Sequence, residues 1–330
     1  MSSFYHRLAS LGIVLTAMTA TVFSHAQDTS AKARIPVILD TDIGDDIDDS
    51  WALAMLLKSP RFDVRLITTT QGLGTQRATI IAKYLTIAGR TDIPIGIGAE
   101  DDLKTGYKLK NWVGDFKLAD YAGTVRADGV QALIDVINHS PAPVTVIVIG
   151  PLGTLGAALR KDPGIAAKAN LTGMQGSVRK GYGTAPGPTP EYNVYSDIPD
   201  AKQVLSAPWR SIAITPLDTA GNVNLSGEGY QRVKRSPDPL LRALIASYMS
   251  FLKVDAAETI SWSGTNFDTV GIYLSDPANR PLLNFEKLKI TVTDNGLTLV
   301  SPNGNEMDVA TSWKDRDAYN EHLTKVLTEK

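Results

Sequence analysis

Short apolar runs alternate with helix-like amphipathic stretches along most of this chain. Runs rich in β-branched residues predict strands at 37–40, 64–70, 93–97, 144–149, 171–174 and 211–215. The stretches between them predict helices at 50–58, 75–88, 128–138, 155–160 and 200–205. Alternation at this spacing is typical of βαβ units and a mostly parallel sheet. We therefore expect an α/β fold, with a doubly wound sheet flanked by helices.

The pattern changes in the second half of the chain. Residues 176–190 are rich in glycine and proline, and such a loop inside a compact domain is usually functional or mobile, so we expect it to border a site as a lid. The tail predicts helices at 239–252 and 267–274, then a hairpin of 287–293 with 297–301 around Asp294-Asn-Gly. No internal repeat or linker is evident, which favours a single domain over residues 27–330.

The N-terminal 26 residues have a different composition. His6 and Arg7 precede the uncharged apolar run 11–23, and Ser24-His25-Ala26 follows. This is the pattern of a cleavable secretory signal, and the run is shorter than the roughly 20 apolar residues that span a bilayer. We expect cleavage after Ala26 and export, most simply to a bacterial periplasm.

Composition narrows the class of protein and of partner. The 330 residues are 43% hydrophobic and 21% charged, with a net charge of −2 and no cysteine. The balanced charge gives no reason to expect nucleic acid or a membrane surface as a partner, which favours a small molecule. The absence of cysteine excludes disulfides, thiolate metal sites and cysteine nucleophiles.

The strongest chemical signal is a group of six aspartates within residues 40–49, between the first predicted strand and the first predicted helix. They are Asp40, Asp42, Asp45, Asp46, Asp48 and Asp49. Ligand sites of open α/β sheets lie at the carboxyl ends of strands, and a helix N-terminus favours negative charge. Carboxylates at this density repel one another, and a hard divalent cation relieves the repulsion. The cluster predicts a metal site.

Two simpler interpretations of this segment fit poorly. In a haloacid-dehalogenase-type phosphatase Asp40 would be the nucleophile, but Gly44 stands where Thr or Val is expected. An EF-hand loop starting at Asp40 would place Trp51, rather than Glu, at its twelfth position.

The segment Asp40-Thr-Asp-Ile-Gly-Asp-Asp-Ile-Asp-Asp-Ser-Trp-Ala-Leu53 resembles the N-terminal signature of nucleoside hydrolases of the inosine-uridine preferring type. Four further segments follow in the family's order: 67–72, 148–155, Glu191-Tyr-Asn193 with Asp197, and Asp268 before an apolar helical stretch. Together the five segments cover residues 35–275. Three residues separate Gly44 from the aspartate pair, against one in the shorter form of the signature, and we align the pair on the helix start as Asp48-Asp49.

The resemblance implies hydrolysis of the N-glycosidic bond of purine or pyrimidine ribonucleosides to ribose and free base. It implies that Ca²⁺ is held by Asp42, Asp49, Asp268 and the backbone carbonyl of Gly153. It makes Asp42 the general base that deprotonates a Ca²⁺-bound water. It assigns the ribose hydroxyls to Asp48, Glu191 and Asn193. Because homo-oligomers are common in the family, it also implies a homodimer or homotetramer.

Two positions depart from the family pattern. Leu73 follows the turn glycine, where many members have Asn or Asp, and Phe267 stands where many have a His that assists the leaving base. Phe267 cannot donate a proton, although it could stack on a nucleobase. Help to the leaving group would then come from Tyr182 or Tyr192, or the base departs without it. Base preference stays open, and so does a riboside that is not a nucleoside.

Some residues and two rival functions stay open at this stage, and the less favoured rival is the metal-dependent phosphatase with Asp40 as nucleophile. Asp48 and Asp49 could be N-terminal capping residues, as could Asp268, and Asp45 and Asp46 have no assigned role. We expect Asp40 to support the loop through backbone hydrogen bonds. The main rival is a periplasmic binding protein that still binds ribose or a nucleoside but has weak catalysis. The retention of Asp42 argues against it.

Overall fold

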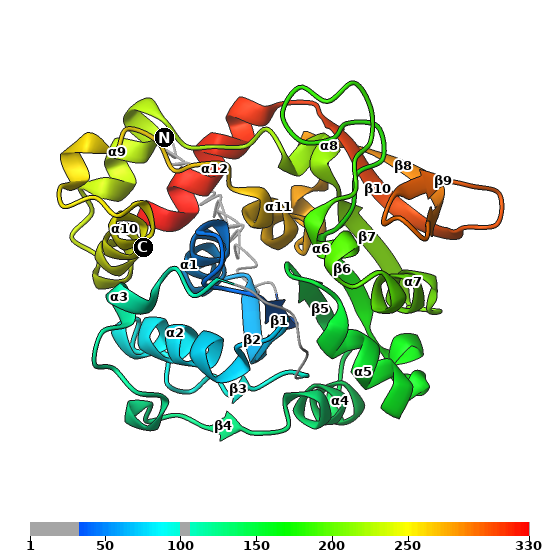
Figure 1. Cartoon of the computed structure of the whole chain (residues 1–330), viewed down its shortest axis with the longest axis horizontal. Coiled ribbons are helices and arrows are strands. Elements are labelled where there is room, and N and C mark those ends of the chain that lie inside the picture. Colours follow the sequence, from blue (N-terminus) through cyan, green and yellow to red (C-terminus); the bar gives the residue numbers. More distant parts are fainter. Residues whose placement is uncertain (1–32, 100–105, 330) are drawn as a thin grey trace, which may run out of the picture. The chain divides into compact units, whose positions relative to one another are not determined.

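The structure is a computed structural model, and it describes residues 33–99 and 106–329. The predicted signal peptide, residues 1–26, lies outside the described residues. Within them, ten strands form one sheet (Figure 1). The strands are β1 (Ile35–Thr41), β2 (Phe62–Thr69), β3 (Ile95–Gly96), β4 (Val125–Arg126), β5 (Thr145–Val148), β6 (Asn170–Met174), β7 (Ser211–Thr215), β8 (Leu283–Val292), β9 (Thr298–Val300) and β10 (Asn305–Trp313).

The strand order in the sheet is β4-β3-β2-β1-β5-β6-β7-β10-β8-β9. The strands β4, β3, β2, β1, β5, β6, β7 and β10, in that spatial order, are parallel to one another. Strand β8 is antiparallel to both β10 and β9. The chain builds outward from β1 in one direction and from β5 in the other. A switch of direction between adjacent strands opens a crevice at their carboxyl ends, where ligands bind in doubly wound folds. The predicted α/β fold is confirmed.

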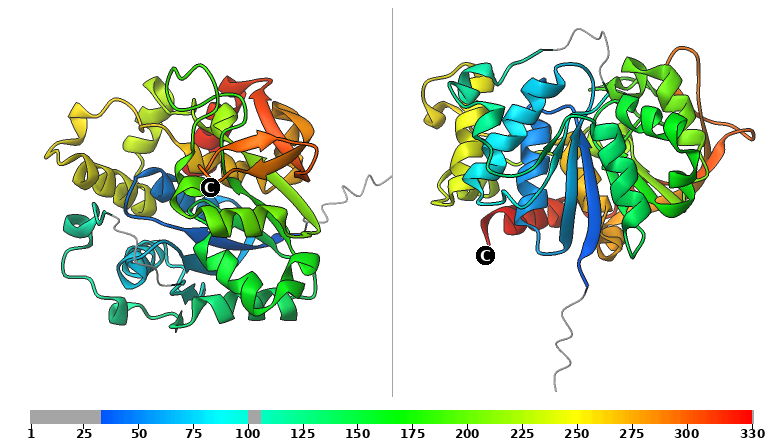
Figure 2. Two further views of the ribbon diagram at one scale, coloured as in Figure 1. Left: turned by 45° about the vertical axis from the view of Figure 1, so that its right-hand side comes forward. Right: turned by 90° about the horizontal axis from the view of Figure 1, so that it is seen from below.

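Helices cover both faces of the sheet, as the right-hand view of Figure 2 shows. The α-helices are α1 (Asp48–Lys58), α2 (Gly74–Ile87), α3 (Lys110–Val113), α4 (Gly129–His139), α5 (Gly153–Lys161), α6 (Tyr192–Ser196), α7 (Ile198–Ser206), α8 (Leu217–Ala220), α9 (Gly227–Lys234), α10 (Pro239–Leu252), α11 (Phe267–Leu274) and α12 (Arg316–Thr328). One apolar core joins the sheet to α1, α2, α9, α10, α11 and α12, and a second joins it to α4, α5 and α7. None of the described helices is both long and apolar enough to cross a membrane.

The central position of α1 explains how its acidic N-terminus comes to be buried. Its residues from Asp48 through Leu56 are all buried, and it packs against α10, α11 and α12. A helix that is apolar on every side is stable only in such an interior place. Because β1 is paired on both edges, with β2 and β5, the turn from β1 into α1 lies deep in the molecule. The carboxylates of this turn are therefore buried.

Differences between prediction and structure fall at element ends, in the tail, and at short elements that were not predicted, namely β4, α3, α6, α8 and α9. The first predicted helix begins two residues earlier than expected, at Asp48. The predicted hairpin is confirmed as β8 and β9, but β10 and α12 were not predicted. Strand β10 is paired on both edges, with β7 and β8, but only about half of its residues are buried, so its run of apolar residues is short.

Candidate active site

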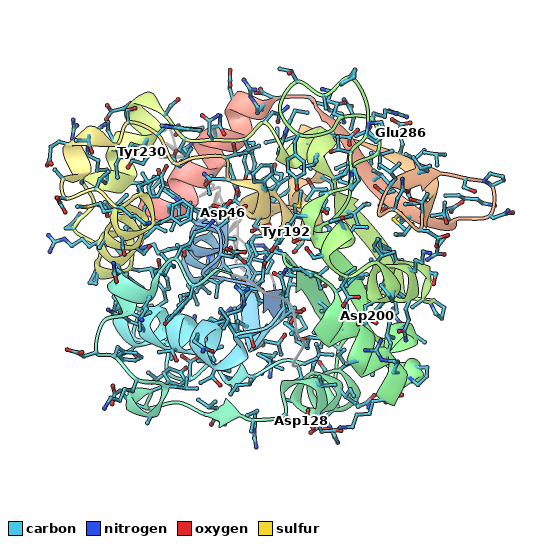
Figure 3. The ribbon with its side chains drawn as sticks, in the orientation of Figure 1. Asp46, Asp128, Tyr192, Asp200, Tyr230 and Glu286 are labelled. Carbon is cyan, nitrogen blue, oxygen red and sulfur yellow. The ribbon has the colours of Figure 1, made fainter. Side chains whose placement is uncertain are left out.

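A cavity of about 290 Å³ lies at the carboxyl ends of β1, β5 and β6, beside the switch point. The residues that line it are Asp42, Asp45, Asp46, Asp48, Asp49, Lys108, Ile149, Met174, Tyr182, Glu191, Tyr192, Asn193, Phe267 and Asp268. The helices α1, α6 and α11 all begin at this cavity, in the middle of the view in Figure 1. Figure 3 labels two of the lining residues, Asp46 and Tyr192, near the middle of the view.

Three buried carboxylates meet inside this cavity. Asp48, Asp49 and Asp268 each offer an oxygen, and these oxygens lie within 4.8 Å of one another. Asp48 and Asp49 open α1, and Asp268 is the second residue of α11, which packs against α1. The hydroxyl of Thr41 donates a hydrogen bond to Asp49 Oδ1, and the carboxyls of Asp48 and Asp268 are hydrogen-bonded to each other. We call these three residues the aspartate trio.

Without a cation, the negative charges of the aspartate trio would repel one another. Burial raises the pKa of Asp48, of Asp49 and of Asp268 well above the ordinary carboxyl value, and the neighbouring carboxylates raise each further. The donor atoms are all carboxylate oxygens, and they converge from two helices. That set matches the preference of hard cations such as Ca²⁺ and Mg²⁺ for oxygen ligands. The trio is therefore consistent with a metal site.

Asp42 lies beside the trio rather than within it. It follows the last residue of β1, and burial raises its pKa to about 6, while the Arg77 guanidinium lowers it. Gly150, at the end of β5, leaves room for this carboxylate, because a Cβ built there would lie 2.7 Å from Asp42 Oδ1. A carboxylate with a pKa near neutrality, facing a cavity, is suited to accept a proton.

Arg77 is a functional residue that the sequence did not single out. It is buried on α2, and its guanidinium donates to the backbone carbonyls of Gln71, Gly72 and Ile43 at 3.0, 3.2 and 3.0 Å. These bonds hold an unusual turn in which Gln71, Gly72 and Leu73 all have positive φ. The left-handed backbone conformation of Leu73 is unfavourable for leucine, and Asn or Asp would adopt it more readily. Only the folded structure shows that Arg77 faces the aspartates.

Asp40 does not belong to the cavity. It is fully buried, is absent from the cavity lining, and accepts a hydrogen bond from the Thr68 hydroxyl of β2. The expectation of backbone hydrogen bonds from the loop is wrong, because its bonded oxygen faces the neighbouring strand. A nucleophile must reach its substrate, so the position of Asp40 also argues against the phosphatase interpretation.

Glu191 and Asn193 line the cavity from the start of α6. The Glu191 carboxylate accepts hydrogen bonds from the backbone N–H groups of Gly176, Asn193 and Val194 at 2.8, 2.8 and 3.3 Å, and burial raises its pKa to about 7. The Asn193 amide nitrogen donates to the carbonyls of Met174 and Ile149. Its amide oxygen is then the atom left to accept a hydrogen bond from a ligand.

Gly153 is the one predicted site residue that the structure does not bring to the cavity lining. It is the first residue of α5, and a Cβ built there would lie 3.1 Å from Asp197 Oδ2.

Aromatic and charged side chains surround the open side of the cavity. The Tyr192 hydroxyl donates to Asp45 Oδ2 at 3.2 Å and accepts from the Gln71 side chain at 2.9 Å. Lys108 lies 3.7 Å from the other oxygen of Asp45. The half-buried ring of Phe267 meets the ring of Tyr182 edge to face, with centroids 6.2 Å apart. The rim is thus partly aromatic and partly charged.

Comparison with known proteins connects this geometry to a family. Residues 37–321 match the family model of the inosine-uridine preferring nucleoside hydrolases. Uridine nucleosidase 1 of Arabidopsis thaliana is 27% identical over 277 residues, 79% of each chain. Pyrimidine-specific ribonucleoside hydrolase RihA of Citrobacter koseri is 27% identical over 236 residues, 66% of this chain and 70% of its own.

Solved structures share the fold. The plant nucleoside hydrolase PpNRh1 superposes with a TM-score of 0.73 at 23% identity, covering 90% of this chain and 100% of its own. An inosine-guanosine nucleoside hydrolase gives 0.73 at 17% identity, covering 89% of this chain and 99% of its own. The family match extends over nearly all of the described chain. The chain therefore belongs to the inosine-uridine preferring nucleoside hydrolase family and is an N-glycosidase.

Proposed function

We propose that this protein hydrolyses the N-glycosidic bond of purine or pyrimidine ribonucleosides, using Ca²⁺ at the aspartate trio and Asp42 as the general base. The observation that carries the proposal is the convergence of three buried carboxylates next to Asp42 at the switch point of the sheet. The names of the relatives include both uridine- and pyrimidine-specific enzymes and an inosine-guanosine enzyme. They leave the preferred base open.

The described residues fit a calcium ion. Asp49 and Asp268, which the resemblance implies as ligands, would hold it together with Asp48, which the resemblance assigned to the ribose hydroxyls. The resemblance adds Asp42 and the carbonyl of Gly153. When bound, the ion would orient the attacking water and the ribose hydroxyls and would make that water easier to deprotonate. The buried carboxylates of the trio supply the charge that such an ion needs.

Asp42 takes a proton from water as the water oxygen bonds to C1′ of the ribose. The C1′–N bond breaks, and its electron pair leaves with the base. Transfer to a placed carboxylate typically speeds such a step by about 10²–10⁴-fold. Positive charge develops on the ribose ring in the transition state, and the surrounding carboxylates stabilise it electrostatically.

The sugar is oriented by the other polar atoms of the cavity. Asn193 offers its amide oxygen to a ribose hydroxyl, because its nitrogen is already bonded to two backbone carbonyls. Glu191 fixes Asn193 by accepting the backbone N–H of that residue. Phe267 offers its ring face to the nucleobase. Polar groups matched to hydroxyls reject sugars that lack them, so a ribosyl group is favoured over a deoxyribosyl group.

The test is a panel of purine and pyrimidine nucleosides incubated with the purified protein, with free base and reducing sugar both quantified. We expect release of both products, loss of release with a chelator, and loss of release in Asp42→Asn. Asp115→Asn is the matched control, because Asp115 is exposed and lies outside the cavity lining. Tight nucleoside binding without release would instead identify a binding protein.

We also propose that the protein is exported after removal of residues 1–26, on the strength of the N-terminal pattern alone. N-terminal sequencing of the protein from cell fractions tests this. A mature chain that begins at Gln27 in the periplasmic fraction is expected, and a chain that retains residues 1–26 in the cytoplasm would contradict it.

A further inference from the structure

Among the described residues that line the cavity, one hydroxyl has a proton that is not donated to the protein. The Tyr192 hydroxyl donates to Asp45, Lys108 is paired with the same carboxylate, and the Asn193 amide nitrogen donates to backbone carbonyls. The Tyr182 hydroxyl also lines the cavity, but it has no acceptor in the described part of the chain. Its proton is therefore available to a ligand.

The position of that hydroxyl is set by its neighbours. The backbone N–H of Tyr192 donates to the Tyr182 hydroxyl oxygen at 3.0 Å, so the oxygen is held and the O–H can turn toward the cavity. The Tyr182 ring is braced edge to face against Phe267. Two aromatic side chains thus form one wall, and only one of them has a hydrogen to donate.

The loop that carries Tyr182 is anchored at both of its stems. Asp218 accepts the backbone N–H groups of Val178 and Arg179, each at 2.9 Å. On the return, Thr189 donates its backbone N–H to the Ser177 hydroxyl at 3.0 Å. Because the loop is held at both stems, Tyr182 is already ordered and loses less conformational entropy when a ligand binds.

The electrostatic setting keeps Tyr182 protonated. Burial raises the pKa of its hydroxyl, and the carboxylates of Glu191, Asp48 and Asp268 raise it further. A phenol in this setting donates a hydrogen bond at neutral pH and does not ionise. It therefore stabilises negative charge placed beside it.

We propose that Tyr182 donates the hydrogen bond that stabilises the nucleobase as it departs. This inference rests on the proposed function. Phe267 stands where many family members have a His, and it has no proton to donate. Tyr182 is favoured over Tyr192 because the Tyr192 hydroxyl already donates its hydrogen to Asp45.

The step balances without a further reactant. The C1′–N bond breaks, and its electron pair stays on the base while water oxygen bonds to C1′ and Asp42 takes the proton of water. Tyr182 keeps its proton and stabilises the departing base through the hydrogen bond. After release the base takes up a proton from solvent, and Asp42 returns its proton to solvent. The net reaction is nucleoside plus water to ribose plus base.

The experiment compares two leaving groups in Tyr182→Phe. On inosine or uridine we expect kcat/KM to fall about 10²-fold, as for loss of one preorganised donor to developing charge. On p-nitrophenyl β-D-ribofuranoside, whose leaving group is stable as an anion, we expect little change. The matched control is Tyr195→Phe, because Tyr195 is exposed and outside the cavity lining, and we expect wild-type rates on both substrates.

Each other outcome overturns the inference in a recognisable way. Equal losses on both substrates would show that Tyr182 acts in folding or sugar binding, and no loss on either would show that its hydroxyl is not used. Wild-type protein that cleaves neither substrate would overturn the proposed function, and the inference with it. If the wild-type protein cleaves nucleosides, the proposed function stands whatever the result for Tyr182→Phe, and that result tests the role of Tyr182 alone.

Discussion

Replacing Asp48 by Asn should stabilise the calcium-free protein while removing its response to calcium. Asp48, Asp49 and Asp268 present oxygens within 4.8 Å of one another in a buried site, and burial together with neighbouring carboxylates raises the pKa of Asp48 to about 8. Without a cation, ionisation of the trio therefore works against folding. Asparagine keeps the size of the side chain and removes its charge.

The size of the expected stabilisation follows from the distance between the carboxylates of the trio. Two unit charges 4.8 Å apart repel by about 3 kcal/mol at an effective dielectric constant of ~20. Relief of one such pair corresponds to a rise in Tm of roughly 5–10 °C for a domain of this size. The rise should be present at pH 8.5, above the pKa of Asp48, and nearly absent at pH 5, where Asp48 is protonated in the calcium-free protein.

The assay is thermal unfolding in chelator and in excess calcium at both pH values. Wild type should gain stability with calcium, by about 2.7 kcal/mol when the free ion is 100 times its Kd. Asp48→Asn should be more stable than wild type in chelator at pH 8.5 and should gain little from calcium. The control Asp115→Asn makes the same change of charge at an exposed position outside the cavity lining, and it should respond to calcium as wild type does. The reasoning is refuted if Asp48→Asn is less stable than wild type in chelator at pH 8.5, or if calcium still stabilises it fully.

Three further predictions follow from particular contacts. Gly150→Ala places a Cβ 2.7 Å from Asp42 Oδ1, so we expect kcat to fall at least about 10-fold with a smaller change in Tm, and unchanged kcat would contradict this crowding. Asp218→Ala leaves the backbone N–H groups of Val178 and Arg179 unpaired, so urea unfolding should show a loss of about 2–4 kcal/mol, and a loss below ~1 kcal/mol would show that these bonds are dispensable. In the calcium-free protein, burial raises the folded-state pKa of Asp42 to about 6, of Glu191 to about 7 and of Asp48 to about 8. Protons are then bound more tightly in the folded state, so the stability these groups contribute is present below about pH 4 and is lost as the pH rises to about 8; a calcium-induced rise in Tm that does not grow over this window would contradict the assignment.

The sequence predicted the fully buried strands of the fold better than its short or partly exposed strands. The continuous apolar run of β5 and the aspartates after β1 are local patterns, and a parallel sheet follows from their alternation with helices. Strand β10 was missed because only part of it is buried, and its pairing with β7 depends on residues far away in the chain. Short strands such as β4 carry too few residues for any pattern to show.

The site was predictable where a local motif carries it. Asp48 and Asp49 stand out as carboxylates at a helix start, whereas Asp268, which lies far along the chain, was assigned only through the family resemblance. Arg77 gives no local signal, because its role depends on three carbonyls of a turn with positive φ. The difference between Tyr182 and Tyr192 likewise depends on which hydroxyl already has an acceptor.

Restoring nucleoside hydrolysis to metal-free protein by adding calcium tests the central claim most directly. The protein is treated with chelator, its metal content is measured, and nucleoside hydrolysis is followed while Ca²⁺ is added back. We expect activity to be lost on treatment and to return in proportion to calcium bound, saturating at one ion per chain in the wild type and not returning in Asp268→Asn. Metal-free protein that cleaves nucleosides at the untreated rate would contradict the account.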